Sequence, residues 1–349
     1  MRRPGLRRAA STCMRPRPGA TRRPRFCVFG LLLALGSGPA TAADDPLASY
    51  LVQSACIDAA GAVIPGRLPF EPGCDRRRPL AAAEPLPYRK HDWPGATDAA
   101  AQPRGYQASD SVLGTLLGRP AAIQTFDFGA PPRQFGRVDP ADGGQAIPLR
   151  PGEDASIAMT EDGGGGLQWF QGPGCRPEAP DAGWLLAAPA PTAAWQQRLV
   201  RLNITPAPDA CPARFNPSLT RWRTASLQLP WREAADGRTA SAPAEVLVSE
   251  HYGGASIAGA DHLERFWLAQ GLGMVRWERW DNAAAGRRPG RAEQAEATAA
   301  ALATSQRCPP IALGEAPGPG WRMVDCRTWT NFAREAPGPG LDWPPQRLR

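Results

Sequence analysis

The chain almost lacks lysine, since Lys90 is the only one among its 349 residues. The 40 basic residues are therefore nearly all arginines, and nine of them lie before residue 26, where no acidic residue occurs. Without these nine, 31 basic residues stand against 33 acidic ones, so the net charge of +7 falls to −2. A chain without a basic surplus lacks the electrostatic footprint of nucleic-acid binding, and we expect no nucleic-acid partner.

Long apolar runs are also missing. The most apolar stretch, FCVFGLLLALG at residues 26–36, is too short for a membrane span, which takes roughly 20 residues. It follows the arginine-rich start and precedes small residues that end in Ala40-Thr41-Ala42, which is the order of a secretory signal peptide. We expect residues 1–42 to export a bacterial protein to the periplasm or the cell exterior, by the general or the twin-arginine route. No transmembrane segment is expected in the mature chain.

Short motifs for catalysis and cofactor binding are absent as well. The sequence has no Gly-x-Ser-x-Gly, zincin helix, Walker loop, dinucleotide fingerprint or calcium-loop spacing. It has no CxxC, and its three histidines lie far from any cysteine, so no metal site and no cofactor are expected. The glycine run 163–166 is interpreted as a hairpin turn, because neither a helix nor Lys-Ser/Thr follows it. Whether the chain is an enzyme stays open.

Six cysteines remain outside the leader, an even number that suits an oxidising compartment. Several pairings are open, but proximity in the sequence favours neighbours. Each such bond closes a modest loop and adds about 2 to 4 kcal/mol of stability. The predicted pairs are Cys56 with Cys74, Cys175 with Cys211, and Cys308 with Cys326.

The mature chain has the pattern of an all-β protein and is expected to be a monomer. Residues 43–102 are rich in Pro, Ala and Arg and predict an extended segment with its own disulfide. Residues 103–285 predict an antiparallel β-sandwich of jelly-roll or lectin/glucanase-like type, because short alternating runs are separated by Gly, Pro and Asp. Residues 286–349 predict one short helix, at 292–306, and a disulfide-stapled C-terminal extension. The expected strands lie near 106–112, 122–128, 155–160, 167–171, 184–187, 198–204, 221–230, 245–252 and 321–332.

The segment HLERFWLAQGLGMVRWERWDN, residues 262–282, predicts a long β-hairpin. Pairing across a four-residue loop, QGLG, places Glu264 opposite Arg279 and Arg265 opposite Glu278, so that opposed charges have opposite signs. A shift by one residue would set Glu264 against Glu278, which disfavours the alternative register.

The two faces of this hairpin differ in character. Phe266, Leu268, Val275 and Trp277 form an apolar face that we expect in the core. The other face mixes charged and aromatic side chains and, with Tyr252 of the preceding strand, is a candidate ligand cleft. Its members on the hairpin are Arg265, Trp267, Arg276, Glu278 and Trp280. The alternative is that a terminal segment covers this face and pairs its charges, in which case Trp267 and Trp280 are buried.

Two functional hypotheses remain open. The first is an exported, non-catalytic binding or cell-envelope protein with carbohydrate as its ligand class, because the 12 tryptophans offer rings on which sugars can stack. The second is a glycan-active enzyme, a glycosidase or lyase, that uses Glu250 with Glu264 or Glu278 as its paired carboxylates. His251 is a candidate for proton transfer in that enzyme. For each of these residues, a purely structural role is the competing explanation.

Overall fold

The structure, a computed structural model, describes residues 46–94, 108–126, 143–162, 167–175, 183–285 and 290–334. The expected leader, the glycine run 163–166 and residues 335–349 lie outside these ranges. Within them, two helices, α1 (Ala48–Leu51) and α2 (Arg291–Ser305), accompany seventeen strands. Pairing between strands is antiparallel except between β12 and β17. The predicted all-β antiparallel fold class with one short C-terminal helix is confirmed.

The strands fall into three groups along the chain. The N-terminal segment contributes β1 (Ser54–Cys56), β2 (Arg77–Pro79) and β3 (Arg89–His91). The next group is β4 (Ser109–Leu116), β5 (Arg119–Phe126), β6 (Gly143–Pro148), β7 (Ala155–Ile157), β8 (Met159–Asp162), β9 (Leu167–Gln171), β10 (Trp184–Ala187) and β11 (Gln196–Thr205). The last is β12 (Asn216–Glu233), β13 (Thr239–Tyr252), β14 (His262–Ala269), β15 (Gly273–Asn282), β16 (Trp321–Thr328) and β17 (Asn331–Ala333).

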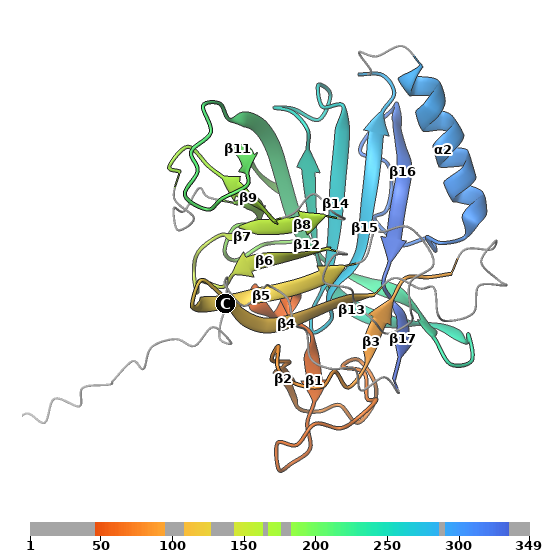
Figure 1. Ribbon diagram of the computed structural model, residues 1–349. Coiled ribbons are helices and arrows are strands. Elements are labelled where there is room, and N and C mark those ends of the chain that lie inside the picture. Colours follow the sequence, from red (N-terminus) through yellow and green to blue (C-terminus); the bar gives the residue numbers. More distant parts are fainter. Residues whose placement is uncertain are drawn as a thin grey trace, which may run out of the picture. The chain divides into compact units, whose positions relative to one another are not determined.

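One large sheet forms both layers of the sandwich. Its strand order is β16-β15-β14-β13-β12-β11-β9-β8-β6-β5-β4, so neighbours in the sheet are nearly always neighbours in the sequence. In Figure 1 the half from β4 to β9 crosses the half from β12 to β16, and α2 lies along β16 at the edge. We call the surface of each half that faces the other half its inner face.

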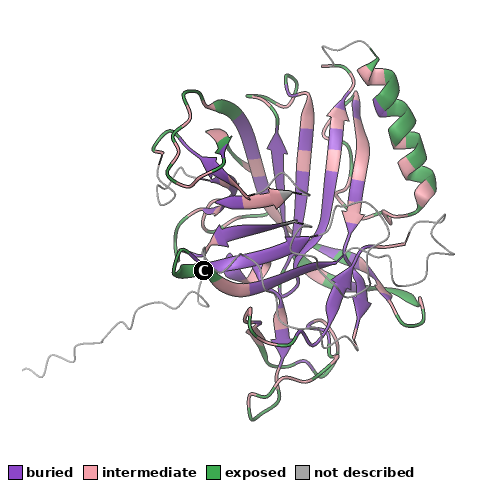
Figure 2. Ribbon diagram, viewed as in Figure 1, coloured by how far each residue is buried: buried purple, intermediate pink, exposed green. Residues whose placement is uncertain are grey.

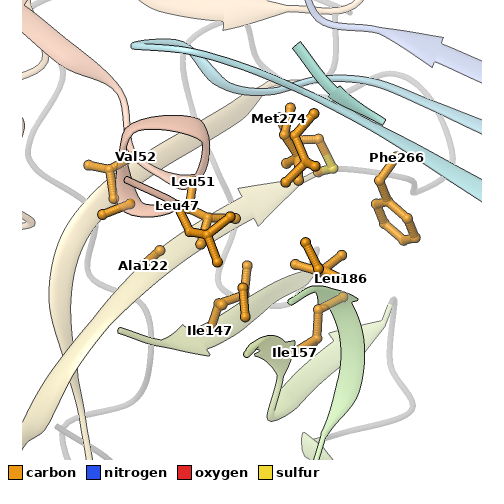
Figure 3. Close-up of a cluster of buried hydrophobic side chains, with 14 of the residues drawn as sticks. Leu47, Leu51, Val52, Ala122, Ile147, Ile157, Leu186, Phe266 and Met274 are labelled. Carbon is orange, nitrogen blue, oxygen red and sulfur yellow. The ribbon is translucent and has the colours of Figure 1, made fainter. Parts of the chain in front are cut away.

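The main apolar core fills part of the space between the two inner faces. Side chains from β5, β6, β7 and β10 meet side chains from β13, β14 and β15 there, and Leu51 of α1 and the preceding Leu47 pack between them (Figure 3). Burial is nearly continuous from Val246 to the end of β13 and along β14 and β15, because both faces of the sheet are covered there (Figure 2).

The predicted hairpin is present as β14 and β15, and its register is confirmed over most of its length. Leu263 to Trp267 pair with Trp280 to Arg276 as expected. The turn was predicted one residue too long: Ala269 pairs with Gly273, and a bulge follows Trp267. Gly273 has a φ of 67°, which favours glycine and closes a three-residue loop. The bulge also turns Val275 away from the predicted face, so that it packs with Trp267 and not with Phe266.

The other sequence predictions for the fold hold to different degrees. Strands β9 and β10 begin and end where expected, whereas β12 and β13 are longer than predicted and β6 was missed. The predicted strand 321–332 is divided into β16 and β17. All three predicted disulfides are confirmed: Cys56–Cys74, Cys175–Cys211 and Cys308–Cys326.

The N-terminal segment is part of the folded body. Tyr88 and Leu68 pack with Trp267 on the outer face of β13 to β15. Lys90, fully buried on β3, donates hydrogen bonds from Nζ to the carbonyl oxygens of Leu272 and Met274, each at 2.6 Å. These bonds attach the N-terminal segment to the turn between β14 and β15. In the described ranges no helix is both long enough and apolar enough for a membrane span.

Candidate functional site

The outer face of β13 to β15 holds Glu250, one of the three carboxylates suggested for catalysis. Its side chain is 1% exposed and accepts hydrogen bonds from Arg221, from Arg265 at 2.8 Å and from the Tyr252 hydroxyl at 2.6 Å. Burial opposes the negative charge, but Arg265 and Arg221 outweigh it and hold the pKa of Glu250 below its ordinary value. The carboxylate therefore has the partners of a structural ion-pair network.

Glu278 belongs to the same network and is fully buried. It accepts hydrogen bonds from Arg276 at 2.7 Å, from Arg265 at 3.0 Å and from the indole of Trp280 at 2.9 Å. The two arginines also donate to backbone carbonyls of the C-terminal segment, at Glu315 and Pro309. Buried charges are tolerated when they are paired and hydrogen-bonded in this way.

The proposed cleft on this face is covered in the structure. Trp267 is 0% exposed and packs beneath the N-terminal segment and Ile311, whereas Trp280 is 6% exposed and packs with Trp321. The alternative of a covered face with paired charges is therefore the arrangement found. All five predicted ligand-binding residues are buried in the structure: Arg265, Trp267, Arg276, Tyr252 and Trp280.

A pocket of about 810 Å³ lies instead between the two inner faces, beyond the apolar core. This volume is in the range of small-molecule sites. The pocket is lined by side chains of both halves of the sheet. Its principal side chains are Phe126, Gln145, Thr160, Gln168, Phe170, Trp184, His251, Asp261, His262, Glu264, Phe266, Trp277, Arg279 and Asp325.

Each half of the sheet contributes a row of polar side chains that runs across the strands. On β6, β8 and β9 the directly opposed residues are Gln145, Thr160 and Gln168. On β13 to β16 they are His251, Glu264, Arg279 and Asp325. Residues opposite one another in neighbouring strands share a face, so each row presents its polar groups to the pocket together.

Aromatic rings lie beside these polar rows. Trp184 stacks on Phe170 with 5.4 Å between ring centroids, and its edge meets Phe266 at 5.8 Å. Phe266 is paired with Trp277 across β14 and β15. The pocket thus combines flat apolar walls with amide, hydroxyl, carboxylate and guanidinium groups, which suits a ring compound that has one apolar face.

Glu264 and His251 are the two catalytic candidates that line this pocket. Glu264 accepts a hydrogen bond from the Trp277 indole at 3.0 Å. His251 is 1% exposed, its Nε2 lies 2.9 Å from the Ser249 hydroxyl, and burial lowers its pKa to about 3. Its imidazole is therefore neutral near pH 7. Glu250 and Glu278 bond to the outer network, so neither shares the pocket with Glu264.

His262 is a pocket residue that the sequence interpretation did not select. Its Nδ1 donates to Asp261 Oδ1 at 2.6 Å, and Arg291 of α2 holds Asp261 Oδ2 at 3.1 Å. Burial opposes the charge on Asp261, but these hydrogen bonds keep the pKa of the carboxyl below its ordinary value. The His262 ring also lies directly over Gly253: a Cβ there would be 2.1 Å from His262 Cε1.

The chemistry of the pocket favours recognition. It supplies several hydrogen-bond donors and acceptors, and its carboxylates are already bonded to neighbouring groups. Within the described ranges, no group of three or more His, Cys, Asp or Glu side chains is placed to hold a metal ion. No protein-family model, no curated protein and no solved structure matches the chain.

Proposed function

We propose that the chain is an exported, non-catalytic binding protein that takes a small ring compound with an apolar face and hydroxyl groups into the inner-face pocket. The observation that carries this proposal is the pocket of about 810 Å³, in which two polar rows flank aromatic walls. Carbohydrate remains the first ligand class, because a pyranose offers an apolar face and several hydroxyl groups. Phenolic rings share this chemistry.

The rival hypothesis of a glycan-active enzyme has less support. A glycosidase needs a pair of carboxyl groups, one on each side of the glycosidic bond that it cleaves. Glu264 lines the pocket, whereas Glu250 and Glu278 are bonded to the arginines of the outer face. Neither suggested pair therefore flanks a common space.

Binding of two probes, methyl β-D-glucopyranoside and phenol, tests the proposal and separates the two ligand sources. Each probe is titrated into the full mature chain while tryptophan fluorescence is followed. We expect at least one probe to bind and to be recovered chemically unchanged. Gln168→Trp, which fills the pocket from a half-buried position on β9, should abolish binding.

The matched control is Gln197→Trp, which adds the same ring at an exposed position on β11 and should leave binding intact. If neither probe binds, or if Gln168→Trp binds them as the unmodified chain does, the pocket proposal is wrong. Release of a reducing sugar from the glucoside would replace the binding hypothesis with the enzymatic one.

Export is proposed from the leader pattern, and the three disulfides support it because such bonds persist in oxidising compartments. Expression of the complete chain in a Gram-negative host, followed by cell fractionation, tests it. We expect a periplasmic or secreted product with Ala43 as its first residue. Retention of residues 1–42 on a cytoplasmic product would contradict export.

A further inference from the structure

If the inner-face pocket binds a ligand, as proposed above, one side chain in it is placed to recognise that ligand. Most polar groups of the pocket are hydrogen-bonded to neighbouring protein groups, but the imidazole of His262 has one nitrogen available to a ligand. His262 lines the pocket and is 35% exposed at its side chain. Its Nδ1 is bonded to Asp261, whereas its Nε2 has no hydrogen-bond partner among the residues that the structure describes.

Asp261 determines which nitrogen of the neutral ring carries the proton. An ionised carboxylate only accepts hydrogen bonds, so the 2.6 Å contact requires the proton on Nδ1. The guanidinium of Arg291 keeps Asp261 in place through two contacts, to Oδ2 at 3.1 Å and to the backbone oxygen at 3.4 Å. The neutral ring consequently has a lone pair on Nε2, which makes that atom an acceptor.

Gly253 holds the ring from the other side. The atoms Cε1, Nδ1 and Nε2 of His262 lie 2.1, 2.4 and 2.7 Å from the place where a Cβ of residue 253 would stand. Only a glycine lets the imidazole lie this close to β13. The ring is thus fixed before a ligand arrives, which reduces the entropy lost on binding.

We propose that His262 Nε2 is the hydrogen-bond acceptor that selects ligands with a hydroxyl or N–H group, and that Asp261 is the positioning residue that sets its tautomer. The ligand rests its apolar face on the aromatic wall of Phe266 and Trp277 and donates one hydrogen bond to Nε2. A compound of the same shape without a donor loses that bond and leaves the acceptor unpaired.

Phenol and anisole form the probe pair for the test, since both have an apolar ring but only phenol donates a hydrogen bond. Their dissociation constants are measured by NMR titration of the full mature chain. One hydrogen bond contributes on the order of 1 kcal/mol, so phenol should bind about fivefold more tightly than anisole. His262→Phe should remove this preference while keeping an aromatic ring in place.

The tautomer is observed directly by ¹⁵N NMR of labelled histidine, with the His262 signals assigned from His262→Phe. We expect the proton on Nδ1 in the unmodified chain. In Asp261→Asn the amide can donate to Nδ1, so the proton moves to Nε2 and the preference for phenol disappears. Asp281→Asn is the control: Asp281 lies 3.6 Å from Arg291 but makes no bond to the His262 ring, so tautomer and preference should persist.

The outcomes separate this inference from the proposed function. Equal binding of phenol and anisole, a preference that survives in His262→Phe, or a proton on Nε2 in the unmodified chain overturns the role of His262 and leaves the pocket as a binding site. If phenol and anisole both fail to bind while methyl β-D-glucopyranoside binds, the role of His262 is overturned and the pocket proposal stands. If none of the three compounds binds, the pocket proposal and the role of His262 fall together.

Discussion

Arg265 and Glu278 face each other across β14 and β15, with 3.0 Å between Nη1 and Oε2, and their side chains are at most 3% exposed. The pair was predicted from the hairpin register, and its burial under a covering segment is the alternative that the sequence left open for this face. Arg265 also bonds Glu250 and the carbonyl of Glu315, so it joins the sheet to the segment that covers it. The many charged side chains of this hairpin therefore have a structural role: they pair with one another and hold the covering segment on the sheet.

Removing Arg265 should be strongly destabilising. Arg265→Met removes the arginine that Glu250 and Glu278 share as a partner in a buried environment. Breaking such a buried ion pair costs about 3 to 5 kcal/mol of stability. Arg198→Met is the comparison, because Arg198 pairs with Asp154 at the surface and half of its side chain is exposed. We expect that change to cost less than about 1 kcal/mol. Urea denaturation of both variants measures the difference, and similar losses would contradict a special role for the network.

The neutral buried imidazole of His251 should make stability depend on pH. Its pKa is lowered to about 3 in the folded protein, below the ordinary value of 6.5, so the unfolded chain binds the proton more readily. The contribution of the neutral His251 ring to the free energy of unfolding is therefore complete above pH 6.5. It is lost as the pH falls toward 3, at about 1.4 kcal/mol per pH unit.

His251→Gln removes this titration without adding a charge. The free energy of unfolding is measured in urea at several pH values between 7 and 4, and the loss on acidification should be smaller in the variant than in the unmodified chain. Parallel curves for the two proteins would show that His251 does not titrate as the structure requires.

Gly253 should tolerate no side chain. A methyl group from Gly253→Ala would meet the His262 ring at 2.1 Å, so the ring must move away from Asp261. We expect a loss of about 1 to 3 kcal/mol in stability and a changed ¹⁵N tautomer pattern for His262. Gly254→Ala is the control for the ring position, because a Cβ at residue 254 has atoms of Ala260, at 3.2 Å and beyond, as its nearest neighbours. Identical His262 spectra in both variants would contradict the claim that the lack of a side chain at residue 253 determines the position of the His262 ring.

The Cys308–Cys326 disulfide should hold the covering segment 309–315 onto the ion network. Replacing both cysteines by serine removes the cross-link that restricts the unfolded chain. We expect this to lower the free energy of unfolding by about 2 to 4 kcal/mol. Hydrogen exchange in 309–315 should accelerate, while probe binding in the pocket persists. The same replacement of Cys175 and Cys211 should leave exchange in 309–315 unchanged. Equal protection of this segment in both variants would contradict the role of the bond.

The sequence pattern predicted the fold class, the helix, the disulfides and most of the hairpin register, because these depend on local spacing and on cross-strand charge. It missed the bulge at the turn, which depends on the positive φ of Gly273 and on the contacts of that loop with the N-terminal segment. Alternation along β14 and β15 distinguishes two faces. It does not tell which of them a distant segment covers.

For the site, the predicted ligand-binding residues lie on the face with charged and aromatic residues, whereas the pocket lies on the other face, which holds the catalytic candidates Glu264 and His251. Phe266 and Trp277 do have buried side chains there, yet the space beyond them stays open because the two halves of the sheet separate. Gln145 and Gln168 come from strands of the other half of the sheet. Nothing in their local sequence indicates that they line the same pocket as Glu264. The adjacent Asp261 and His262, preceded by Gly253, were the available local signal.

The position of bound ligand relative to the tryptophans tests the central claim most directly. In a phenol titration followed by ¹H–¹⁵N NMR of labelled tryptophan, the inner-face account predicts shifts of the Trp184 and Trp277 indole signals, because both rings line the pocket. The indoles of Trp267 and Trp280, buried on the outer face, should remain unchanged. Shifts of Trp267 and Trp280 without those of Trp184 and Trp277 would place the ligand on the outer face and contradict the account.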